Sequence, residues 1–188
     1  MNKQFLQSFK DRLHVMVDLE TLGTSPNSVI LSLGAVFVNF EGAEFYKNFS
    51  IGSQDPRFFS LSMKTLQWWR EQNKEVMLEA FNGKIHLQDG LSLFKEWFPA
   101  DAIIWGNGAD FDIAILKYAY EHFGLDTPWS YKNTACLRTI RNMVDMKLVY
   151  EAVAEQTKDE PLQAHQALHD AKHQALQLRE IFNLLLEE

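Results

Sequence analysis

The order of its apolar patterns most constrains how this chain folds. Segments with the composition of β-strands come first, and segments of helical composition follow them. The segments that read as strands are residues 14–20, 28–40 and 44–52, with a turn signal at 41–43, and a later short run at 102–105. Three strands followed by a strand–helix unit predict an α/β fold, a mixed β-sheet flanked by α-helices. No linker divides the chain, so we expect one domain over residues 1–188.

Several stretches after the first strands are expected to be helical. They are residues 61–81, which end at a turn dipeptide, and residues 88–98, 111–123, 134–144 and 162–188. The last stretch has apolar residues that step by four and three: Ala164, Leu168, Ala171, Ala175, Leu178, Phe182 and Leu185. This period is that of a long helix with one buried face.

The net charge and the apolar runs of the chain indicate which kinds of partner it could bind. The formal charge is −7, so a broad basic surface is not the main means by which this chain would hold nucleic acid. An acidic total is compatible with a metal site, because carboxylate ligands are themselves counted as negative. No apolar run approaches the roughly 18 residues of a membrane span, and the N-terminal segment lacks the apolar core of a secretory signal. With Cys136 as the single cysteine, we expect a cytoplasmic protein without a membrane partner.

The first predicted strand ends with two acidic residues on one face. Asp18 and Glu20 are two positions apart, and side chains at that spacing point to the same side of a strand. At a separation of about 4 Å and an effective dielectric constant of about 20, two such charges repel by about 4 kcal/mol. Exposure to water, a shared proton or a cation would offset this repulsion.

Further carboxylates follow the other predicted elements. Asp110 and Asp112 come after the short strand at 102–105, and Asp170 lies in the last predicted helix. Because sites in α/β sheets gather at the carboxyl ends of strands, these groups are candidates to meet the first pair. Carboxylates from three segments would suit Mg²⁺ or Mn²⁺, which prefer oxygen ligands. The competing interpretation of Asp110, near a helix start, is a helix cap.

His165 precedes Asp170 by five residues, which leaves them about 140° apart around a continuous helix. They converge only if His165 lies in a frayed first turn or in the loop before it, and Pro161 is compatible with a helix start there. A histidine can take a proton from water, and the alternative is an exposed side chain. His165, His169 and His173 step by four and could hold Zn²⁺, but a solvated stripe is the favoured interpretation.

Taken together, these residues resemble the DEDDh family of 3′–5′ exonucleases, which has a ribonuclease H-like fold. The family motif D-x-E-T stands at residues 18–21, and an Asn-containing turn followed by Phe-Asp stands at 107–112. The motif H-x-x-x-x-D-A stands at 165–171, followed by Gln174-Ala175 as in the usual continuation. Residues 68–72, Trp-Trp-Arg-Glu-Gln, also resemble a small phage and bacterial subgroup that carries a Trp-Trp-x-x-Gln helix.

The resemblance implies roles for particular residues. Two divalent cations, Mg²⁺ or Mn²⁺, would be held by Asp18, Glu20, Asp112 and Asp170, with Asp112 rather than Asp110 matching the motif. His165 would be the general base, and the products would be nucleoside 5′-monophosphates cut from nucleic-acid 3′ ends, of DNA or RNA.

The resemblance also implies contacts with the last nucleotide. Thr21 and Leu22 would cradle its sugar and base, with packing under the following loop as the alternative for Leu22. Trp68 and Trp69 are core or rim residues, or one of them stacks on a base. Four basic residues either contact upstream phosphates or are solvated: Arg138, Arg141, Lys147 and Lys172.

Two other functions compete with the exonuclease. One is a nucleic-acid-binding or complex-assembly domain that has the fold without turnover. The other is an HD-type phosphohydrolase, because His169-Asp170 is an HD dipeptide. That architecture is largely helical, whereas the first third of this chain is rich in predicted strands.

Overall fold

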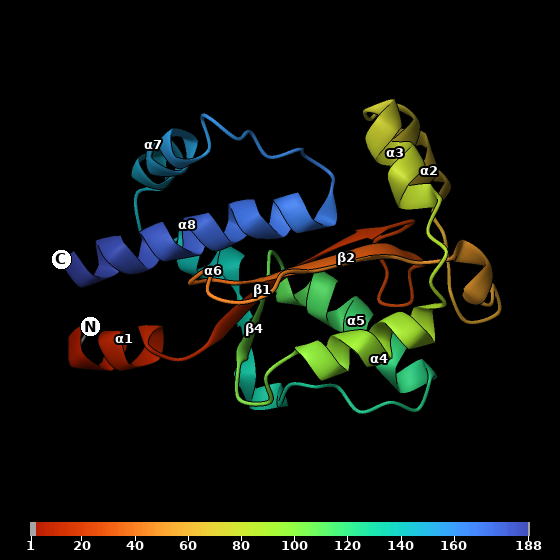
Figure 1. Cartoon of the computed structure of the whole chain (residues 1–188), viewed down its shortest axis with the longest axis horizontal. Helices are drawn as coiled ribbons and strands as arrows, with labels where there is room; N and C mark the ends of the chain where they lie inside the picture. The colour runs from red at the N-terminus through yellow and green to blue at the C-terminus, as the bar shows by residue number, and fades with distance from the viewer. Residues whose placement is uncertain (1–2, 188) are drawn as a thin grey trace.

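The computed structural model describes residues 3–187, apart from the side chains of Phe5, Ala109 and Glu187. It contains a five-stranded sheet in the order β3-β2-β1-β4-β5 (Figure 1). The strands are β1 (His14–Thr21), β2 (Ile30–Phe37), β3 (Phe45–Asn48), β4 (Ile103–Gly106) and β5 (Thr134–Cys136). β1 pairs antiparallel with β2 and parallel with β4. The mixed sheet that the sequence predicted is therefore confirmed, and the largely helical HD-type architecture is excluded.

Helices cover both faces of this sheet. In Figure 1, α8 crosses one face, and α4 and α5 lie on the other. The α-helices are α1 (Lys3–Lys10), α2 (Met63–Arg70), α3 (Lys74–Phe81), α4 (Leu87–Trp97), α5 (Ala114–His122), α6 (Leu137–Arg141), α7 (Met146–Gln156) and α8 (Ala167–Glu187). Short helical turns occur at η1 (Ile51–Ser53), η2 (Ala109–Ile113, a π-helix) and η3 (Tyr131–Asn133). Among residues 3–187, no helix has the length and apolar character needed to cross a bilayer.

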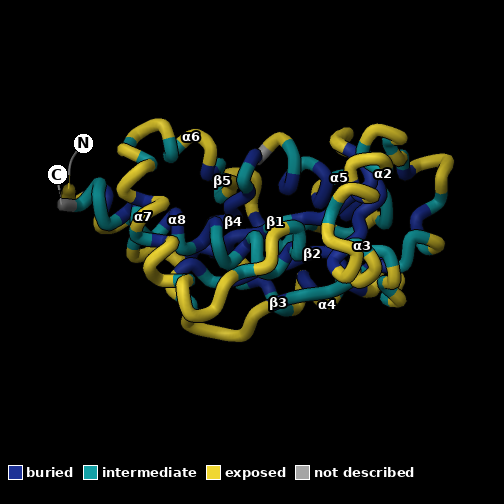
Figure 2. Tube along the Cα trace, turned by 90° about the horizontal axis from the view of Figure 1, so that it is seen from above, coloured by how far each residue is buried: buried dark blue, intermediate teal, exposed yellow. Residues whose placement is uncertain are grey.

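The alternation along β1 divides the core into two clusters. Val15, Val17 and Leu19 pack with α4 and α5, whereas Met16 packs with apolar residues of α8. Figure 2 shows the buried residues gathered along the central strands and the exposed ones in the outer turns and loops. Asp18 and Glu20 have the same parity as Met16, so strand geometry directs both carboxylates to the face that α8 covers.

A glycine lets the first turn of α8 approach the sheet closely. Gly34 of β2 lies opposite Asp18 in the sheet register. A Cβ atom built on Gly34 would lie 2.3 Å from backbone atoms of Ala167 and Leu168. No side chain fits at that distance, so a glycine at this position allows the helix that carries Asp170 to contact the strand pair that carries Asp18.

We expect Gly34→Ala to lower both stability and metal-dependent activity. The new methyl group would push the backbone at the start of α8 away from β2, and overpacking of this kind costs about 1–3 kcal/mol. The free energy of unfolding in urea and the nuclease rate measure the two effects. Gly52→Ala is the matched control, because its Cβ atom would meet only Ser50 Oγ, at 3.7 Å. Equal behaviour of the two variants would contradict this account.

The segment at 61–81 does not form one helix. It folds as α2 and α3, with a break at residues 71–73. The Asn73 side chain caps α3 by accepting hydrogen bonds from the backbone N–H groups of Glu75 at 2.8 Å and Val76 at 3.3 Å. Asparagine is a favoured N-cap, and the helical composition on both sides concealed this start signal.

Other boundaries also differ from the sequence prediction. Residues 134–144 begin as the edge strand β5, where Ala135 lies opposite Trp105 of β4, and become helical only at Leu137. A strand of three residues is too short to show its period in the sequence. Helices α1 and α7 were not expected, and α8 begins at Ala167 rather than at residue 162. Glu188, the expected last residue of α8, lies outside the described residues.

Candidate active site

A cavity of about 430 Å³ lies at the carboxyl end of β1, between α2 and the start of α8. Its walls contain acidic, basic, hydroxyl and aromatic side chains. They include Asp18, Glu20, Thr21, Ser62, Lys64, Thr65, Trp68, Phe111, His165 and Asp170. Most of the residues that the sequence analysis selected therefore meet at one concave surface, although they lie up to 152 positions apart in the chain.

Glu20, His165 and Asp170 form the tightest group in this cavity. Each offers one ligand atom, and these atoms all lie within 4.8 Å of one another. Glu20 is 7% exposed, and the other two residues are half-buried at the open side. This arrangement joins the end of β1 to the start of α8, as the sequence motifs anticipated.

Asp18 lies beside this group with one hydrogen-bond donor. Gln174 of α8 donates from Nε2 to Asp18 Oδ1 at 2.7 Å. Burial raises the pKa of Asp18 well above its usual range, and the negative charges of Asp112, Glu20 and Asp170 raise it further. Burial also raises the pKa of Glu20 to about 8, with Asp170 and Asp112 adding to the effect.

Asp112 lies behind the cavity wall, 2% exposed. Its carboxylate accepts hydrogen bonds from the backbone N–H groups of Leu19 at 3.3 Å and Asn107 at 3.1 Å. Burial raises its pKa to about 7, although these donors favour the ionised form. It is adjacent to the acidic cluster, whereas Asp110 is exposed, so the structure brings Asp112 and not Asp110 to the other carboxylates.

Asp112 owes its position to an unusual local backbone. Residues 109–113 form one turn of π-helix between β4 and α5, and such turns are often found at functional sites. Gly108, just before it, has φ +154°, a conformation that side-chain-bearing residues rarely adopt. A Cβ atom at Gly108 would also lie 3.1 Å from the guanidinium of Arg138.

Asp170 holds His165 in the loop before α8. The backbone N–H of His165 donates to Asp170 Oδ2 at 2.8 Å, and His165 has φ +64°, in the left-handed region. This bend resolves the helical-phase conflict between the two residues, as the sequence analysis required. The imidazole meets the Trp68 ring edge-on, with ring centroids 4.8 Å apart. Burial raises the pKa of Asp170, while the His165 hydrogen bond and nearby histidines lower it.

The donor set fits hard divalent cations. Four carboxylates with raised pKa values are held together, and oxygen-rich sites of this kind suit Mg²⁺ or Mn²⁺. The histidine stripe does not provide a zinc site in the described part of the chain. His169 Nδ1 accepts the Gln163 N–H at 2.9 Å, and His173 Nδ1 lies 3.1 Å from Gln177 Nε2.

Without a cation, the protein should lose stability as pH rises. The folded-state pKa values of Glu20, about 8, and Asp112, about 7, exceed the ordinary values of 4.5 and 3.8. The folded state therefore binds more protons than the unfolded state in this range, so its advantage is present at acidic pH and is lost through pH 7 and 8. We expect the melting temperature in EDTA to fall by several degrees between about pH 5.5 and about pH 8, since about 1 kcal/mol corresponds to about 2–4 °C here.

Mg²⁺ or Mn²⁺ should recover most of this loss, because a bound cation offsets the repulsion between the carboxylates. Glu20→Gln should weaken the pH dependence in EDTA. A melting temperature in EDTA that is constant over this pH range would show that the pKa values of Glu20 and Asp112 are not raised in the folded protein. Differential scanning calorimetry provides the measurement.

The two residues after Glu20 differ in their access to the cavity. Thr21 lines it, although its hydroxyl donates to the Gly23 carbonyl at 2.6 Å. Leu22 does not line it: its side chain is 2% exposed in the core, and its N–H donates to Val29 O at 2.9 Å. The Leu22 side chain thus packs under the following loop, the alternative that the sequence analysis gave, and a contact of Leu22 with the last nucleotide stays a prediction.

The two tryptophans also separate. Trp69 is 1% exposed and donates from Nε1 to the Thr21 carbonyl at 2.9 Å, which makes it a core residue that braces the end of β1. Trp68 is 37% exposed and forms part of the cavity wall. A single tryptophan on the rim is available to a ligand.

Sequence reasoning missed several cavity residues. Ser62, Lys64 and Thr65 come from the start of α2, and Phe111 comes from the π-helix. No spacing signal connects α2 to β1, so only the fold reveals this wall. The four basic residues proposed for phosphate contact do not line the cavity: Arg138, Arg141, Lys147 and Lys172.

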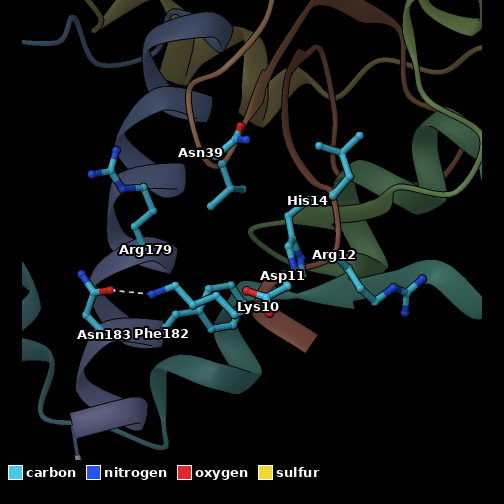
Figure 3. Close-up of a pocket in the computed structure, with 10 residues that line it drawn as sticks. Lys10, Asp11, Arg12, His14, Asn39, Arg179, Phe182 and Asn183 are labelled. Carbon is cyan, nitrogen blue, oxygen red and sulfur yellow. Dashed lines mark hydrogen bonds between the residues drawn. The ribbon is translucent and has the colours of Figure 1, made fainter. Parts of the chain in front are cut away.

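A larger cavity, of about 510 Å³, lies at the opposite end of β1. Figure 3 shows Arg12 and Arg179 extending away from each other, while Lys10 donates to Asn183 Oδ1 at 2.9 Å. His14 is engaged at both ring nitrogens, with Phe9 O at 2.8 Å and Trp105 Nε1 at 2.9 Å. The polar groups of this larger cavity do not converge on one point, so the smaller cavity with the carboxylates is the candidate active site.

Comparisons with known proteins identify a family and a fold for this chain. The sequence model of a family described as the 3′-5′ exoribonuclease Rv2179c-like domain matches residues 13–182. No curated protein sequence matches the chain.

Solved structures with a similar fold include cell-death related nuclease 4 (CRN-4), with a TM-score of 0.59 and 13% identity over 92% of this chain. E. coli exonuclease I in complex with a dA16 oligonucleotide has a TM-score of 0.61 and 14% identity over 94% of this chain. The chain spans 64% and 43% of the lengths of these two proteins. At this identity the similarity shows the fold, which is the ribonuclease H-like fold of such exonucleases.

Proposed function

Because the chain belongs to the family of 3′-5′ exoribonuclease Rv2179c-like domains, we propose that it is a metal-dependent 3′–5′ exonuclease that releases nucleoside 5′-monophosphates. The observation that carries this proposal is the meeting of Glu20, His165 and Asp170 in one cavity, with Asp18 and Asp112 beside them. We take residues 1–188 to act as one exonuclease domain in the reducing cytoplasm.

The carboxylates of Asp18, Glu20, Asp112 and Asp170 would hold two divalent cations, Mg²⁺ or Mn²⁺. Bound there, the cations would lower the pKa of a water molecule and stabilise negative charge on the leaving 3′ oxygen. The protein contributes the placement: β1 supplies Asp18 and Glu20 on one face, α8 supplies Asp170, and the π-helix supplies Asp112. Cations between these groups would explain why buried, mutually repelling carboxylates are tolerated.

His165 would accept the proton of the attacking water. Its backbone N–H is fixed by Asp170 and its ring is braced by Trp68, so the imidazole is held at the cavity while Asp170 retains a second carboxylate oxygen for a cation. A general base placed in this way contributes about 10²–10⁴-fold to the rate.

The substrate would be the 3′ end of a nucleic acid, DNA or RNA. Trp68 offers an aromatic surface at the rim on which a terminal base could stack, and Lys64 is a cation in the same wall. Thr21, which lines the cavity beside Glu20, would contact the last sugar. These groups would act on the end of a strand, which suits a chain whose net charge of −7 disfavours wide contact with a duplex.

The test compares DNA and RNA oligonucleotides, single-stranded and paired, labelled at the 5′ end. Stepwise shortening from the 3′ end with release of mononucleotides, in Mg²⁺ or Mn²⁺ only, is the expected result. Undiminished activity in excess EDTA would disprove the metal mechanism. Binding of oligonucleotide without mononucleotide release in either metal would instead favour the domain without turnover.

A further inference from the structure

The guanidinium of Arg141, the last residue of α6, joins two separate segments of the protein. Its Nη1 donates to Asn107 Oδ1 at 2.7 Å, and its Nε and Nη2 donate to Gln177 Oε1 at 3.0 Å and 2.5 Å. Asn107 belongs to the loop that follows β4, and Gln177 belongs to α8. One planar side chain therefore holds an amide oxygen on each side.

The Asn107 end of this bridge leads directly to Asp112. The backbone N–H of Asn107 donates to Asp112 Oδ2 at 3.1 Å. Fixing the Asn107 side chain therefore fixes the peptide group that orients the carboxylate. The orientation of this peptide group is not set by regular secondary structure, because the following residue, Gly108, has φ +154° and residues 109–113 form a π-helix.

The Gln177 end leads to Asp170. Gln177 is 2% exposed and lies seven residues after Asp170, which places the two residues about 20° apart around the helix. Gln177 Nε2 also lies 3.1 Å from His173 Nδ1, one turn beyond Asp170. The Gln177 side-chain amide thus contacts Arg141 through its oxygen and His173 through its nitrogen. A shift of α8 would therefore move Gln177 and Asp170 together.

We propose that Arg141 is a positioning residue of the metal centre, which sets the distance between Asp112 and Asp170 by tying the β4 loop to α8. The inference rests on the proposed function and deepens it. Arg141 does not line the cavity, and each of its three guanidinium nitrogens donates to a protein oxygen.

The residue type matches this task. Arginine presents several N–H donors in a rigid plane, whereas lysine presents one compact ammonium that cannot reach two oxygens in fixed geometry. Arg141 is half-buried and forms no ion pair within the described residues, so both of its partners are neutral amides. Losing it would leave Asn107 Oδ1 and the buried Gln177 Oε1 without their donor, a cost that movement of the loop would relieve.

The experiment measures Mn²⁺ binding by titration calorimetry and, separately, kcat and KM on an oligonucleotide. We expect Arg141→Ala and Arg141→Lys to weaken Mn²⁺ binding by about 10–100-fold, the range found when the groups that orient metal ligands are disturbed. KM at saturating Mn²⁺ should stay close to the wild-type value. Lys158→Ala removes an exposed positive charge just after helix α7 and should leave both measurements unchanged.

Gln177→Met tests the same contact from its other side, in case the arginine variants do not fold. It keeps a similar volume and removes the acceptor, and it should weaken Mn²⁺ binding in the same direction. Circular dichroism and melting temperatures confirm that each variant is folded.

The outcomes separate the two proposals. Wild-type Mn²⁺ affinity in folded Arg141→Lys and Gln177→Met would overturn the positioning role while leaving the exonuclease proposal intact. A raised KM with unchanged Mn²⁺ affinity would instead make Arg141 a substrate contact. A wild-type protein that binds Mn²⁺ but releases no mononucleotide would overturn the exonuclease proposal, and the calorimetric test of Arg141 would still be decisive.

Discussion

Asp18→Asn should abolish most of the exonuclease activity and at the same time stabilise the metal-free protein. The asparagine oxygen can still accept the hydrogen bond from Gln174, so the local geometry is preserved while one charge is lost. That charge is disfavoured in the folded protein by burial and by three neighbouring carboxylates, so its removal relieves repulsion. The same charge is needed to hold a cation, and we expect a rate loss of about 10³-fold or more, equivalent to about 4 kcal/mol of transition-state stabilisation.

The opposite signs of these two effects make the experiment discriminating. Initial rates with labelled oligonucleotide in Mg²⁺ give the first effect, and melting temperatures in EDTA at about pH 8 give the second. Asp110→Asn is the matched control, because Asp110 is an exposed acid two residues from Asp112. A folded Asp18→Asn protein that retains more than about a tenth of the wild-type rate would remove Asp18 from the metal centre.

His165→Asn should reduce the rate by about 10²–10⁴-fold while Mn²⁺ binding stays nearly unchanged. The hydrogen bond that holds Asp170 comes from the backbone N–H of residue 165, which asparagine also provides. Asparagine tolerates the left-handed backbone found at φ +64°, so this variant avoids the strain that alanine would introduce. It cannot accept a proton from water in the way an imidazole can.

Single-turnover rates at saturating Mn²⁺, together with calorimetric Mn²⁺ affinity, separate proton transfer from metal binding in this variant. His169→Asn tests a half-buried histidine of α8 that does not line the cavity, and it should retain most of the activity. A wild-type rate in His165→Asn would exclude His165 as the general base. A parallel loss of Mn²⁺ affinity would show that His165 is a ligand instead.

Short-range patterns in the sequence accounted for much of the fold. The alternation along residues 14–20 is a property of any strand, so it predicted that Asp18 and Glu20 share a face before their surroundings were known. The apolar period in the last helix predicted a buried face in the same way, and the five-residue spacing required His165 to lie outside regular helix. The break at Asn73 and the strand β5 escaped prediction, because helical composition masks a cap and three residues carry no period.

The sequence by itself determined which reactive side chains the protein contains. Through the periodicity of strands and helices, it also determined which of these side chains share a face. Only the tertiary structure decided which of those faces meet. It brought α2, with Lys64 and Trp68, to the wall of the cavity, buried Leu22 in the core, and placed Arg141 between two segments rather than at the surface. The physical reason is that side-chain direction follows from local backbone geometry, whereas contacts between distant segments depend on how whole elements pack, as the approach of α8 over Gly34 shows.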